Sequence, residues 1–288
     1  MSQPCELVVA GTVAEACAAL QAPGAVAVAG GTAVGLLLRA RLLAPERLVL
    51  LGRIPGLSGI ELDAGGTLRL GAMATLAELA ADRRVRSSCP SLAEAAARAA
   101  NPRIRAVATL GGHLAHADPR QDLPPVLLAL GAVVTVSGPH GVRQIPVGEL
   151  LTGFMATVLQ PDELVVEVGI PPRAGRRDGY VRFAPNSALD FPTVGVAAEV
   201  VLDESGVVTA ARVALGGVAP TAVLVAGAPA ALVGRRPSAG DLDRLAEAAA
   251  EAAAPTDDQR GSVEYKTAMA AVWARRAVAG LVTPRRGG

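Results

Sequence analysis

The stretch Val26-Ala27-Val28-Ala29-Gly30-Gly31-Thr32-Ala33 joins a short apolar run to a glycine pair and a hydroxyl side chain. Residues 25–29 predict a β-strand, and the apolar residues from about 34 to 41 predict a helix. Glycines between a strand and a helix leave backbone N–H groups exposed at the positive end of the helix. The stretch therefore predicts a phosphate-binding loop.

The residues on either side complete a unit of alternating strands and helices. Residues 7–9 and 47–51 predict two further strands. Thr12 and Glu15 have the spacing of a capping box, which begins a helix that runs to Leu20. We expect a small β-α-β-α-β unit.

A second glycine pair lies in Thr109-Leu110-Gly111-Gly112-His113, after residues 106–110, which we expect to form a strand. Thr109 and His113 bring a hydroxyl and a ring N–H that suit a phosphate. The carboxylates of Asp118 and Asp122 follow, and they suit the hydroxyl groups of a ribose or a ribityl chain. This set of groups favours a dinucleotide.

A glycine pair alone is a weak signal in this chain. With 32 glycines in 288 residues, roughly three or four such pairs are expected by chance, and five occur. The spacing around the two loops is neither G-x-G-x-x-G nor Gly-Lys-Ser/Thr, which disfavours a Rossmann NAD site and a P-loop NTPase.

His113, His116 and Asp118 form an H-x-x-H-x-D string that leaves a metal site as an alternative. We favour the phosphate interpretation, because no helical period was evident around the string that would align the three side chains. No general base stands beside them either.

The rest of the chain separates into two predicted domains, 1–172 and 179–288, at the charged, glycine-containing stretch 173–179. The first would contain subdomains of about 1–53 and 54–172. In the second we expect an antiparallel sheet followed by two helices. The further strands are expected at 59–62, 68–72, 132–137, 142–147, 163–170, 180–184, 194–202 and 207–215, and the further helices from Thr75, from Ser91, at 123–129, 242–253 and 263–281.

Composition excludes several classes of function. The formal net charge is +1, and no basic run is interleaved with aromatic residues, which argues against nucleic acid as a partner. No apolar stretch reaches membrane-spanning length and no secretory signal is visible, so we expect a cytoplasmic protein. The three cysteines, expected to be buried reduced thiols, are too few to ligate an ordinary iron–sulfur cluster.

Several ordered motifs together resemble a known family, the FAD-binding medium subunits of the molybdenum hydroxylases, which include aerobic carbon monoxide dehydrogenase and xanthine dehydrogenase. The resemblance covers essentially the whole chain. It rests on the A-G-G-T and T-L-G-G loops and on Pro45-Glu46-Arg47-Leu48-Val49, Leu70-Gly71-Ala72, Ile104-Arg105, Ala117-Asp118-Pro119, Pro161-Asp162-Glu163-Leu164 and Gly216-Gly217-Val218-Ala219-Pro220.

The resemblance implies an α+β fold: a two-part FAD-binding domain of the vanillyl-alcohol-oxidase/PCMH type, then an antiparallel sheet with helices. FAD would lie between these domains. Residues 29–33 (Ala29, Gly30, Gly31, Thr32, Ala33) would wrap the pyrophosphate, with Thr109, Gly111, Gly112 and His113 as a second wall. Asp118 and Asp122 are the carboxylates expected at the cofactor, with Asp122 binding a hydroxyl.

The chain departs from the family pattern at several positions. The family usually has Asn at the position of His113, another Asn at that of Ala106, and a polar residue at that of Ala33. Arg182 stands where related proteins often carry a Lys facing the flavin. Phe191 occupies a place where some relatives have an aromatic over the isoalloxazine, although a core position is an equal alternative for it.

The resemblance also implies a division of labour. A molybdenum-cofactor large subunit would oxidise the substrate, a [2Fe–2S] small subunit would relay electrons, and FAD on this chain would deliver them to an external acceptor. A dimer of such heterotrimers is expected. Two alternatives stay open: a stand-alone flavin oxidoreductase of the same fold, and an assembly subunit that has lost FAD.

Overall fold

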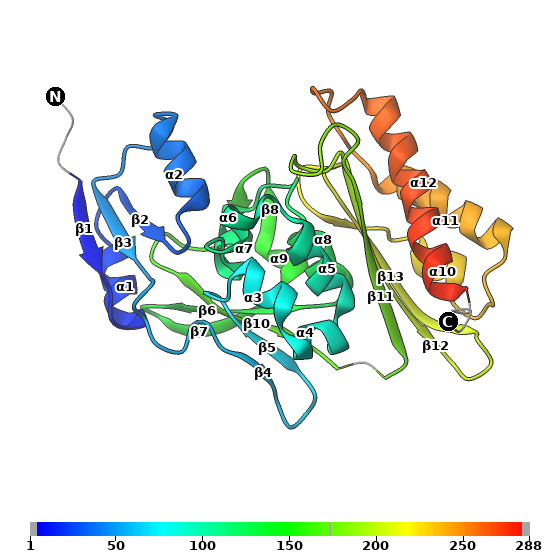
Figure 1. Cartoon of the computed structure of the whole chain (residues 1–288), viewed down its shortest axis with the longest axis horizontal. Coiled ribbons are helices and arrows are strands. Elements are labelled where there is room, and N and C mark those ends of the chain that lie inside the picture. Colours follow the sequence, from blue (N-terminus) through cyan, green and yellow to red (C-terminus); the bar gives the residue numbers. More distant parts are fainter. Residues whose placement is uncertain (1–4, 173, 284–288) are drawn as a thin grey trace.

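The structure is a computed structural model that describes residues 5–172 and 174–283. It is elongated, with the N-terminal elements at one end and the last helices at the other (Figure 1). We call residues 5–172 the N-terminal part and residues 174–283 the C-terminal part. None of the helices in these ranges has the length and apolar character of a transmembrane span.

The predicted β-α-β-α-β unit is present at the N-terminal end. It consists of β1 (Glu6–Val9), α1 (Val13–Leu20), β2 (Ala25–Val28), α2 (Thr32–Arg39) and β3 (Arg47–Leu50). The three strands are parallel in the order β1-β3-β2. Thr12 accepts a hydrogen bond from the Glu15 N–H and so begins α1 as expected, but the Glu15 carboxylate accepts from the Gly11 N–H, so the expected capping box is incomplete.

A five-stranded sheet forms the centre of the molecule, in the order β4-β5-β10-β6-β7. A small two-stranded ladder of β8 and β9 lies beside it. The elements are β4 (Ile60–Leu62), β5 (Leu68–Gly71), α3 (Leu76–Ala81), α4 (Arg83–Ser88), α5 (Pro90–Arg98), α6 (Pro102–Arg105), α7 (Leu110–His116), α8 (Leu123–Ala129), β6 (Val133–Gly138), β7 (Gly141–Pro146), α9 (Val147–Leu150), β8 (Leu151–Gly153), β9 (Ala156–Thr157) and β10 (Leu164–Ile170).

The C-terminal part is the expected antiparallel sheet with helices. Its strands are β11 (Arg176–Phe183), β12 (Val194–Leu202), β13 (Val208–Gly216) and β14 (Val223–Leu224), which lie in chain order. The helices α10 (Ala228–Leu232), α11 (Ala239–Ala252) and α12 (Val263–Val282) cover one face. Helices α5 and α8 of the N-terminal part pack against the sheet as well.

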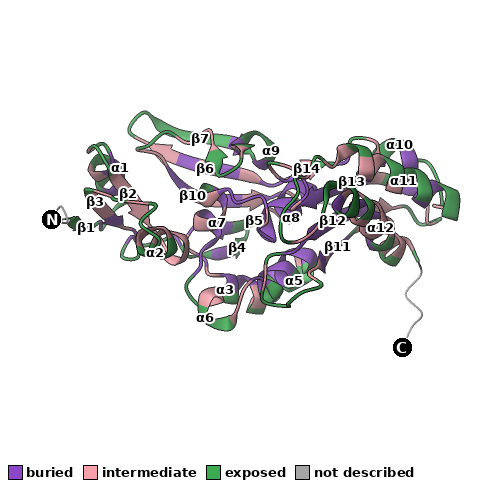
Figure 2. Ribbon diagram, turned by 90° about the horizontal axis from the view of Figure 1, so that it is seen from above, coloured by how far each residue is buried: buried purple, intermediate pink, exposed green. Residues whose placement is uncertain are grey.

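The two parts share a hydrophobic core. Tyr180, Ala197 and Ala214 of the C-terminal sheet belong to the same buried cluster as the helices of the five-stranded unit. Figure 2 shows buried residues concentrated where α5 and α8 meet β11 and β12. The residues of α2 are instead intermediate or exposed. Helix α2 has no buried residue.

Three expectations were wrong. Residues 106–110 form no strand, because Pro102 begins the short helix α6 and Thr109 caps the next helix. Helix α5 begins at Pro90, one residue before Ser91, and its N-cap makes no side-chain hydrogen bond. Cys5 is exposed, whereas Cys17 and Cys89 are buried.

Candidate functional site

A cavity of about 560 Å³ lies where the three-stranded unit, the helices of the five-stranded unit and a loop of the C-terminal part meet. Small-molecule sites commonly measure roughly 300–1,000 Å³. The cavity brings together residues that are far apart in the sequence. Of the predicted site residues, those that line it are Ala29, Gly30, Gly31, Thr32, Ala33, Thr109, Gly111, Gly112, His113, Asp122, Arg182 and Phe191.

The first glycine loop has the geometry of an anion site. Gly31 is the N-cap of α2 in the left-handed conformation (φ 69°), and it offers no side-chain cap. The N–H of Gly35 donates to the Gly31 carbonyl in the first turn of the helix. The N–H groups of residues 32–34 come before this first intrahelical hydrogen bond, so no helix carbonyl accepts from them. They lie at the positive end of the helix, beside the cavity.

Gly30 fixes the position of this loop. Its Cα packs directly against the backbone of Val107 and Ala108, where a side chain has no room. Ala29 likewise lies next to Gly112 of the second loop. The two glycine pairs therefore lie close together at the cavity, and glycine is needed at residue 30 for close approach of two backbones.

The second glycine pair works differently from the first. It lies inside the first turn of α7, where Leu110 and Gly111 donate their N–H groups to Ala74 and Ala72. Gly112 donates to Oγ1 of Thr109, at 3.2 Å. The expectation of free backbone N–H groups in this loop is therefore wrong, because protein acceptors engage them all. What this wall offers is a close-packed surface without side chains, the Thr109 hydroxyl and the His113 ring.

His113 lies in α7 and is one of the residues that line the cavity. Burial lowers the pKa of His113 to about 4, with a further contribution from His116 and an opposing one from Asp118. The imidazole is therefore neutral at pH 7, with one ring N–H to donate.

The sequence argument against a metal at His113-x-x-His116-x-Asp118 used a wrong premise, because both histidines do lie on one helix. Asp118, however, follows the C-cap of that helix, and its carboxylate binds Arg120. No cluster of three metal-ligand side chains occurs in the part of the chain that the structure describes.

Asp118 does not line the cavity. Its two oxygens accept hydrogen bonds from Nε and Nη2 of Arg120, at 2.8 and 2.6 Å. Burial alone would raise the pKa of Asp118, but the hydrogen bonds from Arg120 outweigh this and hold it below the ordinary value. The Asp118 carboxylate therefore holds the Arg120 side chain in place next to the cavity.

Asp122 lies on the cavity, at the N-terminus of α8, and is 3% exposed. Its Oδ1 accepts hydrogen bonds from the Tyr180 hydroxyl at 2.7 Å and from Nε of Arg182 at 2.8 Å. Burial raises the pKa of Asp122, and the Arg182 guanidinium and the Tyr180 hydroxyl offset part of that effect. Both donors come from β11, so this carboxylate joins the two parts of the molecule.

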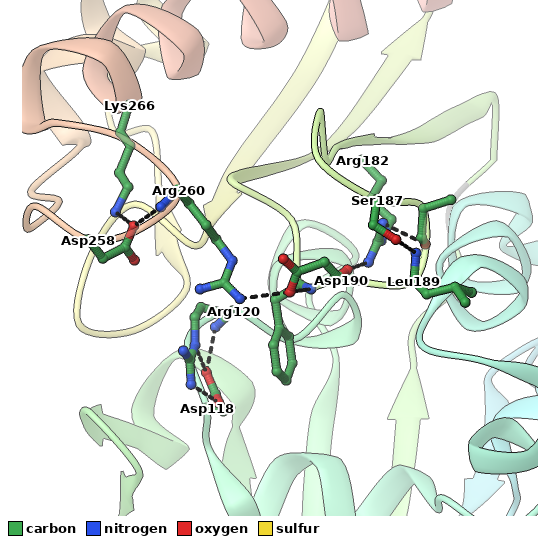
Figure 3. Close-up of polar contacts among 11 residues, drawn as sticks. Asp118, Arg120, Arg182, Ser187, Leu189, Asp190, Asp258, Arg260 and Lys266 are labelled. Carbon is green, nitrogen blue, oxygen red and sulfur yellow. Dashed lines mark hydrogen bonds and ion pairs between the residues drawn. The ribbon is translucent and has the colours of Figure 1, made fainter.

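Arg182 extends the network to the loop between β11 and β12. Its Nη1 and Nη2 donate to the carbonyl groups of Ala188 and Asp190. Figure 3 shows Asp190 between Arg182 and Arg260, and the Asp190 carboxylate accepts from Nη2 of Arg260 at 2.7 Å. Arg182 therefore lies on the cavity wall with its Nε and both Nη atoms bonded to protein.

Phe191 follows Asp190 at the cavity wall and is 41% exposed. The guanidinium carbons of Arg120 and Arg260 lie 4.9 and 5.9 Å from its ring centroid. These cation–π contacts hold the ring in place. A core position for Phe191, the alternative considered from sequence, is excluded by this exposure.

Three residues of the site were missed by sequence reasoning: Tyr180 as a partner of Asp122, and Asn101 and Gln121 on the cavity wall. Gln121 is 7% exposed, and among the described residues its Oε1 has no hydrogen-bond donor. A buried acceptor without a donor is costly, so a ligand group that donates there would be favoured. No pattern in the sequence distinguished this Gln.

Two family matches cover nearly the whole chain. Residues 3–173 match the family described as the FAD binding domain in molybdopterin dehydrogenase. Residues 179–281 match the C-terminal domain of the CO dehydrogenase flavoprotein. The chain belongs to the FAD-binding medium subunits of the molybdenum hydroxylases.

Named relatives of this medium subunit agree with the assignment. It is 35% identical to the carbon monoxide dehydrogenase medium chain of Hydrogenophaga pseudoflava, over 87% of this chain and 86% of the relative. It is also 35% identical to subunit alpha of the 6-hydroxypseudooxynicotine dehydrogenase complex of Paenarthrobacter nicotinovorans, over 88% and 85%.

A solved structure extends the comparison to the fold. A chain of the H. pseudoflava carbon monoxide dehydrogenase that lacks the Mo-pyranopterin moiety superimposes with a TM-score of 0.93, at 34% identity, over 98% of both chains. The α+β fold with an FAD-binding domain and a C-terminal sheet is therefore confirmed.

The described cavity fits the cofactor of this family. FAD carries a pyrophosphate, for which the uncapped first turn of α2 provides amide donors. It also carries hydroxyl and amino groups, for which Oε1 of Gln121 and Oδ2 of Asp122 are acceptors without donors in the part of the chain that the structure describes. The medium subunit is a FAD-dependent oxidoreductase component.

Proposed function

We propose that this medium subunit receives electrons from a [2Fe–2S] partner subunit and passes them through its FAD to an external acceptor. The observation that carries the proposal is the cavity, which combines an anion site with buried acceptors and lies against both parts of the chain. Bound FAD supplies the redox chemistry, since it exchanges electrons with both one-electron and two-electron partners.

The protein's contribution is binding and orientation. We propose that residues 29–33 hold the pyrophosphate, with the amides of the first turn of α2 as donors. Thr109, Gly111, Gly112 and His113 would form its second wall, and Oδ2 of Asp122 would accept from a cofactor hydroxyl. Arg182 and Phe191 would border the flavin from the C-terminal part. Asp118 would act indirectly, through Arg120 and its contact with Phe191.

The family supports a proposal for the partners but not for the substrate. We propose a complex with a molybdenum-cofactor large subunit and a [2Fe–2S] small subunit, assembled as a dimer of heterotrimers. The two relatives at 35% identity belong to complexes named for carbon monoxide and for 6-hydroxypseudooxynicotine, so identity alone selects no substrate. A cytoplasmic location stays a prediction, as do the domain limits 1–172 and 179–288.

The test is to purify the chain with the proteins that accompany it and to measure flavin, iron and molybdenum. A yellow complex whose flavin is bleached by substrate would support the proposal. A correctly assembled but colourless complex would contradict it. Oxidation of a bound substrate by the purified chain alone would instead support the stand-alone oxidoreductase.

A further inference from the structure

The Tyr180–Asp122 pair connects the cavity to the C-terminal part at a single carboxylate. Tyr180 is 3% exposed and its ring packs in the core shared by both parts. Its hydroxyl donates to Oδ1 of Asp122 at 2.7 Å. Asp122 is on α8 of the N-terminal part, and Tyr180 is on β11.

The two oxygens of Asp122 have different environments. Oδ1 accepts both the Tyr180 hydroxyl and Nε of Arg182. No group in residues 5–172 or 174–283 donates to Oδ2, although Asp122 is nearly buried and lines the cavity. The donors from β11 thus fix the rotation of the carboxylate and leave one oxygen for a ligand.

We propose that Tyr180 is a positioning residue of the flavin site, which orients Asp122 through Oδ1 so that Oδ2 meets a cofactor hydroxyl. Cofactor binding and docking of the C-terminal part then stabilise each other, because both depend on one orientation of the same carboxylate. This inference rests on the proposed placement of FAD.

Strand β12, next to Tyr180, carries a glycine opposite this hydroxyl. Gly195 on β12 pairs with Arg182 on β11. A Cβ atom at Gly195 would lie 2.7 Å from the Tyr180 oxygen but 3.4 Å from the nearest ring carbons. The hydroxyl is therefore the nearest obstacle to a side chain at residue 195, and Gly195→Ala should displace it while Asp122 stays unsubstituted.

The first test compares FAD binding to the full chain and to Tyr180→Phe. The variant keeps the buried ring and removes one oxygen, so the core is preserved. A hydrogen bond to a charged group contributes enough for the dissociation constant of FAD to rise about tenfold. Tyr265→Phe is the matched control, since this ring is 39% exposed and its hydroxyl has no hydrogen bond among the described residues.

The second test is a double-mutant cycle with Gly195→Ala, which separates positioning from general destabilisation. Gly195→Ala alone should weaken FAD binding about as much as Tyr180→Phe. Added to Tyr180→Phe, it should have little further effect, because the oxygen that the new methyl group would meet is gone. Fold-changes that multiply would overturn the proposal.

A third measurement addresses reciprocity. FAD should slow hydrogen exchange of the β11 amides in the wild-type chain, and at saturating FAD this protection should be reduced in Tyr180→Phe. Equal FAD affinity and equal protection in the two proteins would refute the inference while leaving the proposed function intact. A wild-type chain that binds no FAD even when it is assembled with its partner subunits would refute both.

Discussion

A Cβ atom at Gly30 would lie 1.8 Å from the carbonyl oxygen of Val107. This separation is far below van der Waals contact, so the loop at residues 29–33 and the segment before α7 share a backbone contact that admits no side chain. The contact sets the spacing between α2 and the second wall of the cavity, and several expectations follow from geometry of this kind.

Gly30→Ala should move the loop away from Val107 and lower FAD affinity about tenfold or more, because overpacking of this kind commonly costs 1–3 kcal/mol. Gly35→Ala is the control, since a Cβ there meets nothing within 4 Å. It should stabilise α2 by about 0.5–1 kcal/mol. Flavin content after purification and FAD titration measure both effects, and full flavin content in Gly30→Ala would show that the loop is misplaced.

His113 should make the cofactor-free chain less stable in acid. Its pKa is about 4 in the fold against an ordinary value of 6.5. The unfolded chain therefore binds the extra proton between these values, and stability falls as pH drops from 6.5 to 4. His113→Asn removes this titration. Between pH 7 and pH 4.5 its free energy of unfolding should therefore fall by about 2 kcal/mol less than that of the wild type. Urea unfolding at several pH values measures this, and parallel profiles would contradict it.

Asp118→Asn should affect stability more than cofactor binding. Loss of the charge-assisted pair with Arg120 should cost about 2 kcal/mol, because the Asp118 side chain is 3% exposed. FAD affinity of the folded variant should stay within about threefold of the wild-type value, which is roughly 0.6 kcal/mol. A loss of tenfold or more would mean that Asp118 contacts the cofactor after all, as the sequence suggested.

The three cysteines should differ in reactivity. Cys5 is exposed, whereas burial raises the pKa of the Cys89 thiol to about 12 and also raises that of Cys17. A thiol reagent at pH 8 should therefore modify one thiol per folded chain and three per unfolded chain. Cys5→Ser should abolish the reaction of the folded protein. Rapid modification of a second thiol would show that α1 or α5 opens readily.

Local signals were sufficient for much of the fold. Thr12 begins α1 and Pro124 lies in the first turn of α8, each as the sequence indicates, whereas α2 begins at Thr32, two residues before the predicted start at about residue 34. These features act within a few residues and need no tertiary information. The strand predicted at 106–110 failed because a five-residue apolar run has no distinguishing period, so burial of Ala108 and Leu110 was mistaken for strand character.

Only part of the candidate site could be predicted from the sequence. The glycine loops and Asp122 were chosen from sequence because phosphate and hydroxyl recognition needs those residue types, and they do line the cavity. The hydrogen bond between Tyr180 and Asp122 was not predicted, since it joins residues that are 58 positions apart in the sequence. The use of the α7 amides was also missed, because their acceptors, Ala72 and Ala74, are backbone carbonyls that no side-chain pattern marks.

The first turns of α7 and α2 differ in whether the polypeptide supplies acceptors for their amides, and this difference affects how the newly made protein folds. The first turn of α7 has acceptors for its amides within the polypeptide, so that wall can be complete as soon as the chain has folded. Helix α2 has no buried residue and no side-chain cap. We expect the amides of its first turn to donate to the phosphate of a bound cofactor. We therefore expect α2 to be the less stable of the two helix starts in a newly synthesised chain, and proteolysis before cofactor binding should begin there.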